Sequence, residues 1–338
     1  MVLVMRKLIN EPVRFVDEML EGIYAAHPEK VKYIGADLRC LVNARKKPGK
    51  VGLATGGGSG HLPLFLGYVG DGMLDGCSIG GVFQSPSSFQ MLEVTKEIDS
   101  GAGVLYIYGN YGGDILNFDM AAEMADVEGI RVEQVIAGED VASATKGNED
   151  KRRGVAGIFY VFKIAGAMAE EMASLAEVKR VAEKVCANVR TMGVALSPCT
   201  IPEVGRATFE IAEGEMEIGM GIHGEPGIHK GPLKNADAVV DEMLGPILED
   251  LPFKSGDEVS VLINGLGATP KEELYGLYRR VAELLKLKGI NIFSPYIGEF
   301  ATSMEMAGAS ISLLRLDDEL KRLLAKPADT PFFVQNQL

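Results

Sequence analysis

Apolar positions recur along this chain in two alternating patterns. Apolar residues at helical spacing predict helices over residues 13–23, 88–98, 118–126, 165–192 and 270–285. Short apolar runs rich in β-branched residues predict strands over residues 51–54, 103–108, 130–135, 259–264, 291–293 and 310–316. Strands that alternate with helices are typical of sheets covered by helices. We therefore expect an α/β fold: two α/β domains with mainly parallel or mixed sheets flanked by helices.

The length of 338 residues exceeds what one compact core usually organises. The long helical segment 165–192 separates two halves that each have their own strand–helix pattern, so we place the boundary near Val185. Residues 1–185 are the predicted N-terminal domain, and residues 186–338 are the predicted C-terminal domain. In open α/β sheets, ligands bind at the carboxyl ends of strands, so the loops after these strands are where chemistry is expected.

Composition and charge exclude several classes of protein. The hydrophobic content of 47% is that of a globular protein, and the formal charge of -13 disfavours binding to nucleic acid. Residues 154–169 are the most apolar, but Lys163 interrupts a run that is too short to span a bilayer. Residues 1–5 are too short for the core of a secretory signal, so we expect a cytoplasmic protein without membrane contact.

The four cysteines are widely spaced in apolar stretches and form no CxxC pair. This spacing disfavours zinc and redox motifs and predicts buried free thiols. The cysteines are Cys40, Cys77, Cys186 and Cys199.

A glycine-rich segment over residues 55–63 follows the first predicted strand. Its glycines let backbone N–H groups approach a ligand closely, although such a cluster is also compatible with a mere tight turn. It is neither a Walker A loop nor a dinucleotide fingerprint, because no Gly-Lys-Ser/Thr follows and His61 occupies the place of the third glycine. A histidine at the exit of such a loop is suited to proton transfer. His61 is therefore a candidate catalytic residue.

The segment over residues 109–118 directly follows another predicted strand. Its Asp114 could cap the following helix or point into a ligand site, and the sequence leaves both open.

A third segment, residues 219–227, matches Gly-x-Gly-x-x-Gly, but Glu225-Pro226-Gly227 favours a turn where a dinucleotide site needs a helix. His223 could be a core histidine satisfied by a backbone partner. The glycines around it, however, expose an imidazole that could add to a carbonyl. His229 is expected at the surface, and two histidines without carboxylate or cysteine partners at ligand spacing predict no metal site.

These segments resemble, in order, the ketose-binding subunit of the dihydroxyacetone kinase family, over nearly the whole chain. The resemblance rests on Leu8-Ile9-Asn10, residues 56–61, residues 110–118, Arg152-Arg153-Gly154-Val155-Ala156, His223-Gly224-Glu225-Pro226-Gly227-Ile228 and Leu266-Gly267-Ala268-Thr269-Pro270.

The resemblance implies that His223 forms a covalent hemiaminal with the carbonyl of a short ketose. It also implies that His61 and Asp114 bind substrate hydroxyls and manage the proton of the attacking hydroxyl. The implied substrate-binding residues are Gly58, Ser59, Gly60, His61, Gly109 and Asp114.

The phosphoryl donor implied by the resemblance lies outside this chain, which contains no Walker A loop or kinase signature. We expect no cofactor on this chain, and ADP or ATP with Mg²⁺ on a separate nucleotide-carrying helical subunit. A phosphotransferase-system phosphocarrier serves that subunit in many bacteria. Family resemblance also suggests a homodimer.

Two positions depart from the pattern of many family members, which have glutamate at Leu62 and a substrate-contacting lysine at Gly109. Loss of the lysine opens space, which makes a larger four- or five-carbon ketose a rival to dihydroxyacetone. The alternative function is a non-catalytic coactivator that senses the ketose, since the family includes such proteins. A nicotinamide oxidoreductase would rest only on the glycine pattern at residues 219–224.

Overall fold

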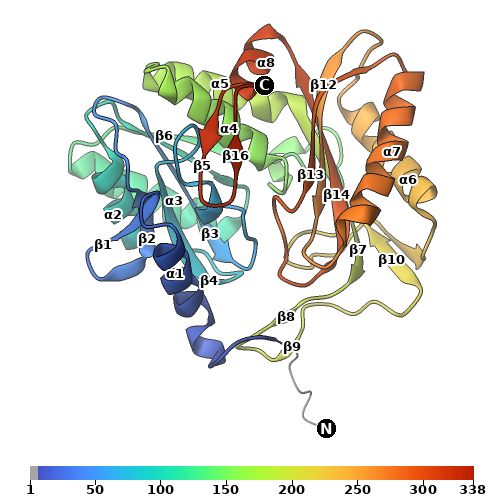
Figure 1. Ribbon diagram of the computed structural model, residues 1–338, viewed down its shortest axis with the longest axis horizontal. Helices are drawn as coiled ribbons and strands as arrows, with labels where there is room; N and C mark the ends of the chain where they lie inside the picture. Colours follow the sequence, from blue (N-terminus) through green and yellow to red (C-terminus); the bar gives the residue numbers. More distant parts are fainter. Residues whose placement is uncertain (1–6) are drawn as a thin grey trace.

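The computed structural model describes residues 7–338 and consists of two sheets with helices between them and on both outer sides (Figure 1). Residues 1–5, which we judged too short for a secretory signal, lie outside the described residues. The layers follow the order helices, first sheet, helices, second sheet, helices. This arrangement confirms the predicted α/β class.

The first sheet has six strands in the order β1-β2-β4-β3-β5-β6. Strands β4, β3, β5 and β6 run parallel, whereas β1 and β2 are antiparallel to their neighbours. The strands are β1 (Val31–Ile34), β2 (Asp37–Asn43), β3 (Gly52–Ser59), β4 (Gly76–Val82), β5 (Val104–Gly109) and β6 (Val132–Ala137). The carboxyl ends of β3 and β5 therefore meet at one edge, as the sequence predicted.

The second sheet has six strands in the order β11-β10-β7-β14-β12-β13, and only β12 and β13 are parallel. Its strands are β7 (Val189–Ser197), β10 (Glu215–Ile218), β11 (His229–Pro232), β12 (Glu258–Gly265), β13 (Asn291–Gly298) and β14 (Ala307–Leu316). Two short hairpins complete the strands: β8 (Thr200–Ile201) with β9 (Arg206–Ala207), and β15 (Ala328–Asp329) with β16 (Val334–Gln335).

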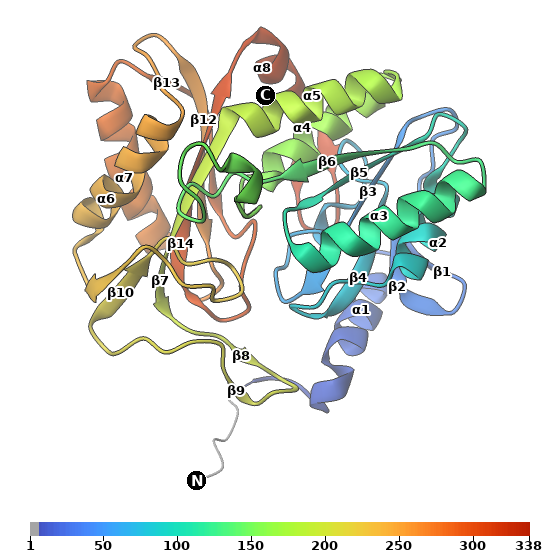
Figure 2. The same cartoon turned by 180° about the vertical axis from the view of Figure 1, so that it is seen from behind.

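Helices α4 (Ile158–Glu170) and α5 (Leu175–Asn188) lie between the sheets, as both views show (Figures 1 and 2). Helices α2 (Ser88–Ile98) and α3 (Gly112–Val127) cover the outer side of the first sheet, and α6 (Ala236–Asp250) and α7 (Lys271–Leu287) that of the second. The remaining helices are α1 (Phe15–Ala26), α8 (Asp318–Leu324) and three 3-10 turns, Pro12–Arg14, Leu66–Tyr68 and Glu149–Lys151.

Most predicted elements are confirmed at or close to their expected positions. The prediction for residues 88–98 coincides with α2, whose N-cap Ser87 forms a capping box with Gln90. His27 is the C-cap of α1, as expected for a residue before proline.

The prediction of one helix over residues 165–192 is wrong. The chain leaves α4 through Met172, whose φ is +59°, and restarts at Ser174, whose side chain caps α5. From Val189 the chain is a strand, because the β-branched residues Val189, Thr191 and Val194 fit the centre of the second sheet.

The expected start of a helix at Phe118 is also wrong, because α3 begins at Gly112. The first turn contains Gly112 and Gly113, and glycine has low helix propensity, so the sequence pattern did not indicate a helix there.

The division into domains at residue 185 stays a prediction. The two sheets lie on either side of this residue, but one continuous hydrophobic core joins them through α4 and α5 and includes Leu53 of β3 and Leu314 of β14. The C-terminal residues also return to the first half, where Asp329 pairs with Lys30 and Arg45.

Within residues 7–338, no helix is long and apolar enough to cross a membrane. Lys163 lies fully buried in α4, where its ammonium donates a hydrogen bond to the carbonyl of Leu323.

Candidate active site

The glycine cluster after residue 54 belongs to β3 itself, which runs to Ser59, so our interpretation of Gly56–Gly58 as a loop is wrong. Close tertiary contacts leave no room for a side chain at these positions, so glycine is required there. A Cβ on Gly57 would lie 2.3 Å from the Phe65 ring, and a Cβ on Gly58 would lie 2.7 Å from the backbone of Phe83. The loop begins at Gly60, whose φ of +102° suits glycine.

His61 follows this turn and is almost completely buried. Its Nδ1 lies 2.7 Å from the carbonyl oxygen of Thr302. A carbonyl can only accept, so Nδ1 carries the proton and Nε2 keeps a lone pair. Burial and the neighbouring His223 lower the pKa of His61 to about 3, and the ring is therefore neutral. Nε2 is buried without a hydrogen-bond partner among the described residues.

Asp114 lies in the first turn of α3, two residues after the helix begins, while the N-cap is Tyr111. It is therefore not the N-cap of that helix. Burial raises the pKa of its carboxyl group to about 6, against the opposing effects of Ser85 and His223. Its Oδ1 is buried and has no hydrogen-bond partner within residues 7–338. A buried polar atom without a partner is costly, so both this oxygen and Nε2 of His61 are suited to a polar ligand.

His223 lies in the loop between β10 and β11, and its side chain is 25% exposed. Its Nδ1 lies 3.0 Å from Oε1 of Glu225, and its backbone N–H donates to Oε2 of the same carboxylate at 2.9 Å. The partner is thus a carboxylate rather than a backbone group, contrary to the alternative of a satisfied core histidine. In the neutral ring, an Nδ1–H that donates to Glu225 leaves the lone pair on Nε2.

Three rings surround the imidazole of His223. The His61, Tyr111 and Phe83 rings stand edge-on to it, with centroid distances of 4.7, 4.8 and 5.3 Å. Phe83 also stacks on His61 at 4.8 Å and has a φ of +57°. The aromatic surroundings restrict the space around the imidazole of His223.

The site lies between the two halves of the chain, which hydrogen bonds hold together. The backbone of Gly60 and His61 pairs with that of Thr302 and Met304 in the loop between β13 and β14. Ser303 of the same loop donates from its hydroxyl to the carbonyl of Ile222, next to His223. The tertiary structure thus brings His61 and His223 together across 162 positions of sequence.

Other predicted residues have different surroundings. The Ser59 hydroxyl donates to the carbonyl of Gly80 at 2.9 Å, so its side chain is already engaged. His229 is exposed and pairs with Glu242, as expected for a surface residue. The four cysteines are free, and Cys186 is only partly buried.

Gly109, at the end of β5, is packed against Tyr111. A Cβ at this position would lie 3.0 Å from Cε2 of that ring, whose hydroxyl donates to the carbonyl of Gly154. We expected the absence of a lysine side chain at Gly109 to leave space for a larger ketose. The Tyr111 ring occupies that space next to the backbone. Leu62, the other departure, is partly buried and lines a surface hollow together with Leu8 and Met304.

Sequence reasoning missed the residues that support the two histidines: Phe83, Tyr111, Arg153, Glu225 and Thr302. Glu225 lies two residues after His223, which is the one spacing that could have indicated a carboxylate partner. Thr302 and Phe83 gave no signal, since only the fold brings them to the site.

Metal ligation has no evident basis in the described chain, where no three His, Cys, Asp or Glu side chains cluster at ligand distance. In the described structure, no helix begins between Gly219 and His229. The Gly-x-Gly-x-x-Gly pattern at residues 219–224 therefore lacks the helix that a dinucleotide site needs.

The fold and the site define an α/β protein that holds two buried or half-buried histidines and a carboxyl group at the junction of two sheets. The family described as "Dak1 domain" matches residues 21–332. This chain therefore belongs to the Dak1 family, as its motifs predicted.

Two known proteins illustrate the similarity of this chain to kinases and kinase subunits. The "PTS-dependent dihydroxyacetone kinase 2, dihydroxyacetone-binding subunit DhaK" of Listeria innocua is 51% identical, with 97% of this chain and 99% of that protein covered. The D-erythrulose kinase of Mycolicibacterium smegmatis is 43% identical, with 97% of this chain but 56% of that protein covered.

Two solved structures are similar over nearly the whole chain. The native dihydroxyacetone kinase of C. freundii has a TM-score of 0.89 at 33% identity, and 98% of this chain and 60% of that chain are covered. The dihydroxyacetone kinase operon co-activator Dha-DhaQ also has a TM-score of 0.89, at 31% identity, with 97% and 100% covered.

Proposed function

We propose that this chain is the ketose-binding subunit of a dihydroxyacetone-kinase-type phosphotransfer system. The observation that supports this most directly is the meeting of two imidazoles, His223 with a free Nε2 and His61 with an acceptor Nε2. The Asp114 carboxyl group lies near enough for His223 to lower its pKa against the effect of burial. Relatives named as dihydroxyacetone-binding subunits cover nearly the full chain.

The first step is covalent capture of the ketose. The Nε2 lone pair of His223 adds to the carbonyl carbon, and the carbonyl π pair moves to oxygen. The oxygen gains a proton as the ring gives up its Nδ1 proton, so the product is a neutral hemiaminal and no water leaves. A polyol without a carbonyl cannot react in this way, which separates a ketose from glycerol.

The second step is transfer of a phosphoryl group to a terminal hydroxyl of the captured ketose. Asp114, with a pKa raised to about 6, is ionised at neutral pH and basic enough to accept the hydroxyl proton. His61 accepts a hydrogen bond from the substrate through Nε2. The hydroxyl oxygen attacks phosphorus as the bond to the leaving group breaks.

The phosphoryl donor belongs to a partner in this proposal. ADP or ATP with Mg²⁺ is carried by a separate helical subunit, and a phosphocarrier renews it where the system depends on phosphoenolpyruvate. The C. freundii kinase, solved with AMP-PNP and Mg²⁺, is matched over only 61% of its length, so that protein has room for nucleotide binding outside the shared part. A homodimer and a cytoplasmic location complete the proposal, and four free thiols agree with a reducing compartment.

Dihydroxyacetone and a four-carbon ketose are both candidate substrates, since similar proteins are named for dihydroxyacetone and for erythrulose. Tyr111 fills the space beside Gly109, and this favours the smaller ketose.

Intact-protein mass spectrometry with dihydroxyacetone, D-erythrulose, L-erythrulose and glycerol tests the capture step. We expect an adduct of the full ketose mass on the wild type, none on His223→Ala and none with glycerol. If a crystal soak with each ketose leaves His223 unbonded and no adduct forms, the proposal is wrong.

A ketose-sensing coactivator is the second candidate, because the co-activator Dha-DhaQ matches this chain at a TM-score of 0.89. It would capture the ketose yet support no phosphorylation when a nucleotide-carrying subunit and a phosphoryl donor are added. Measured ketose phosphate in that reconstituted mixture, lost in Asp114→Asn, would favour the kinase.

A further inference from the structure

Two adjacent arginines, Arg152 and Arg153, connect the first half of the chain to the second in different ways. Arg152 is 1% exposed, and its guanidinium forms a bidentate pair with Asp250, at 2.9 and 2.6 Å. Asp250 ends α6 and also pairs with Arg190. This arginine therefore fixes a helix end, and within residues 7–338 it forms no hydrogen bond or ion pair with the loop that carries His223.

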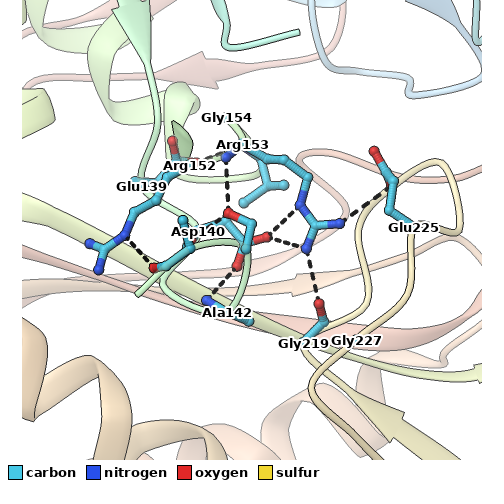
Figure 3. Close-up of polar contacts among 12 residues, drawn as sticks. Glu139, Asp140, Ala142, Arg152, Arg153, Gly154, Gly219, Glu225 and Gly227 are labelled. Carbon is cyan, nitrogen blue, oxygen red and sulfur yellow. Dashed lines mark hydrogen bonds and ion pairs between the residues drawn. The ribbon is translucent and has the colours of Figure 1, made fainter. Parts of the chain in front are cut away.

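Arg153 instead reaches that loop (Figure 3). Its guanidinium contacts Asp140 at 3.0 and 2.8 Å, donates to the carbonyl of Gly219 at 3.0 Å and lies 3.8 Å from Oε2 of Glu225. One planar group thus joins a carboxylate of the first half to both ends of residues 219–225. Three partners in different directions suit the fork of an arginine and exceed what a lysine ammonium can reach.

Glu225 links Arg153 to His223, because its two carboxylate oxygens accept hydrogen bonds from the backbone N–H and from the ring of His223. The local sequence is adapted to the charged pair. A Cβ on Gly221 would lie 2.2 Å from Oε2 of Glu225 and 2.5 Å from Nη1 of Arg153. Glycine at this position is therefore required for the carboxylate and the guanidinium to meet.

The ionisation of Glu225 agrees with this role. Burial alone would raise its pKa, but the hydrogen bond and charge of His223, with Arg153 and a backbone hydrogen bond, lower it to about 2. An ionised carboxylate can only accept, so Nδ1 of His223 is the donor, and in the neutral ring the lone pair lies on Nε2.

We propose that Arg153 is a positioning residue for ketose capture: it anchors Glu225 between Asp140 and Gly219, and Glu225 then fixes the ring orientation and tautomer of His223. The inference rests on the proposed function, since it assigns Arg153 to the capture step. The same contact makes the capture geometry depend on correct docking of the two halves of the chain.

The test compares Arg153→Lys with Arg152→Lys, a matched control that also weakens a contact between the two halves. The protein has only four histidines, so ring ¹⁵N spectra of histidine-labelled protein are simple, and His223→Ala assigns the signals. The rate of adduct formation with dihydroxyacetone is measured on the same samples.

In Arg153→Lys, we expect the two ring nitrogens of His223 to move from one tautomer towards a mixture of both. Adduct formation should slow by about 10²-fold, as for a misplaced reacting group. Glu225→Gln, which keeps the shape of the side chain, should give the same changes even if Arg153→Lys does not fold. Arg152→Lys should lower the unfolding temperature while the His223 signals and adduct rate stay as in the wild type.

Wild-type ring shifts and adduct rate in folded Arg153→Lys would overturn the inference, and so would equal changes in Arg152→Lys. If Arg153→Lys does not fold, wild-type ring shifts and a wild-type adduct rate in Glu225→Gln would overturn the inference. The proposed function is judged separately, by the wild type: absence of any adduct there refutes ketose capture, whereas a tautomer change in Arg153→Lys still establishes the positioning contact.

Discussion

The imidazole rings of His61 and His223 meet edge to face, with their centroids 4.7 Å apart and their planes at 79°. One histidine follows a strand of the first sheet, and the other lies in a loop of the second. Each donates its Nδ1 proton to an oxygen, so both have Nε2 free. In the proposed function, the two rings serve different parts of one ligand: His223 adds to the carbonyl carbon, and His61 binds a hydroxyl.

Replacement of His61 should separate capture from transfer. In His61→Asn, we expect the ketose adduct on His223 to remain, because His223 keeps its Glu225 partner. Phosphorylation with the partner subunit should fall by about 10²-fold, because loss of the hydrogen bond to Nε2 misplaces the reacting hydroxyl. The comparison of adduct mass with ketose phosphate formed per minute checks this. Equal loss of both would show that His61 acts on capture itself.

The same histidine should make the fold sensitive to acid. Its pKa in the folded state is lowered from 6.5 to about 3, so the unfolded chain binds the proton first. Its contribution to stability is therefore complete above the ordinary pKa and is lost as pH falls below it. We expect a loss of about 2 kcal/mol between pH 6.5 and about pH 5. Urea unfolding against pH should show this slope in the wild type and in His229→Asn but not in His61→Asn.

Asp114 has the opposite linkage. Burial raises its pKa from 3.8 to about 6, so its charge destabilises the folded state once pH rises through about 6. We expect Asp114→Asn to stabilise the protein at about pH 8 by up to about 3 kcal/mol, while phosphorylation is lost. The gain should vanish near pH 4, where the wild-type carboxyl group is protonated when folded. A variant no more stable than the wild type at either pH would contradict the buried state of this carboxyl group, whose Oδ1 has no partner within residues 7–338.

Gly109 controls the position of Tyr111. In Gly109→Ala the new Cβ would lie 3.0 Å from the tyrosine ring, which must move relative to His223. We expect adduct formation to slow by about 10-fold, because a displaced wall alters the approach to Nε2. Gly276→Ala, on an open face of α7, is the control. An unchanged rate in Gly109→Ala would mean that Tyr111 does not shape the capture site.

Gly58 is required by packing. Its replacement by alanine places a Cβ 2.7 Å from the backbone of Phe83 and Gln84, which cannot move as a flexible side chain can. We expect Gly58→Ala to lower the free energy of unfolding by about 1–3 kcal/mol. Gly276→Ala meets no atom within 4 Å and should raise it by roughly 0.5–1 kcal/mol, because alanine favours the helix. Urea unfolding of both variants measures the difference.

Local patterns determined much of the secondary structure. The helix over residues 88–98 and the strand near residues 259–264 were predictable, because helical spacing and buried β-branched runs are properties of a few neighbouring residues. The glycine strand at Gly56–Gly58 was not, since glycine has no strand preference and contacts with Phe65 and Phe83 hold it there. The break at Met172 was missed because its neighbours are good helix formers on both sides.

The family and the three groups of the candidate site could be predicted from the sequence, because His61, Asp114 and His223 each lie in a distinctive local motif. The residues that support them depend on the folded structure. Thr302, Glu225, Arg153 and Tyr111 act through hydrogen bonds, charge and ring contacts that exist only after two sheets have docked. Such contacts depend on distance in space, and the order of residues along the chain carries no direct record of that distance.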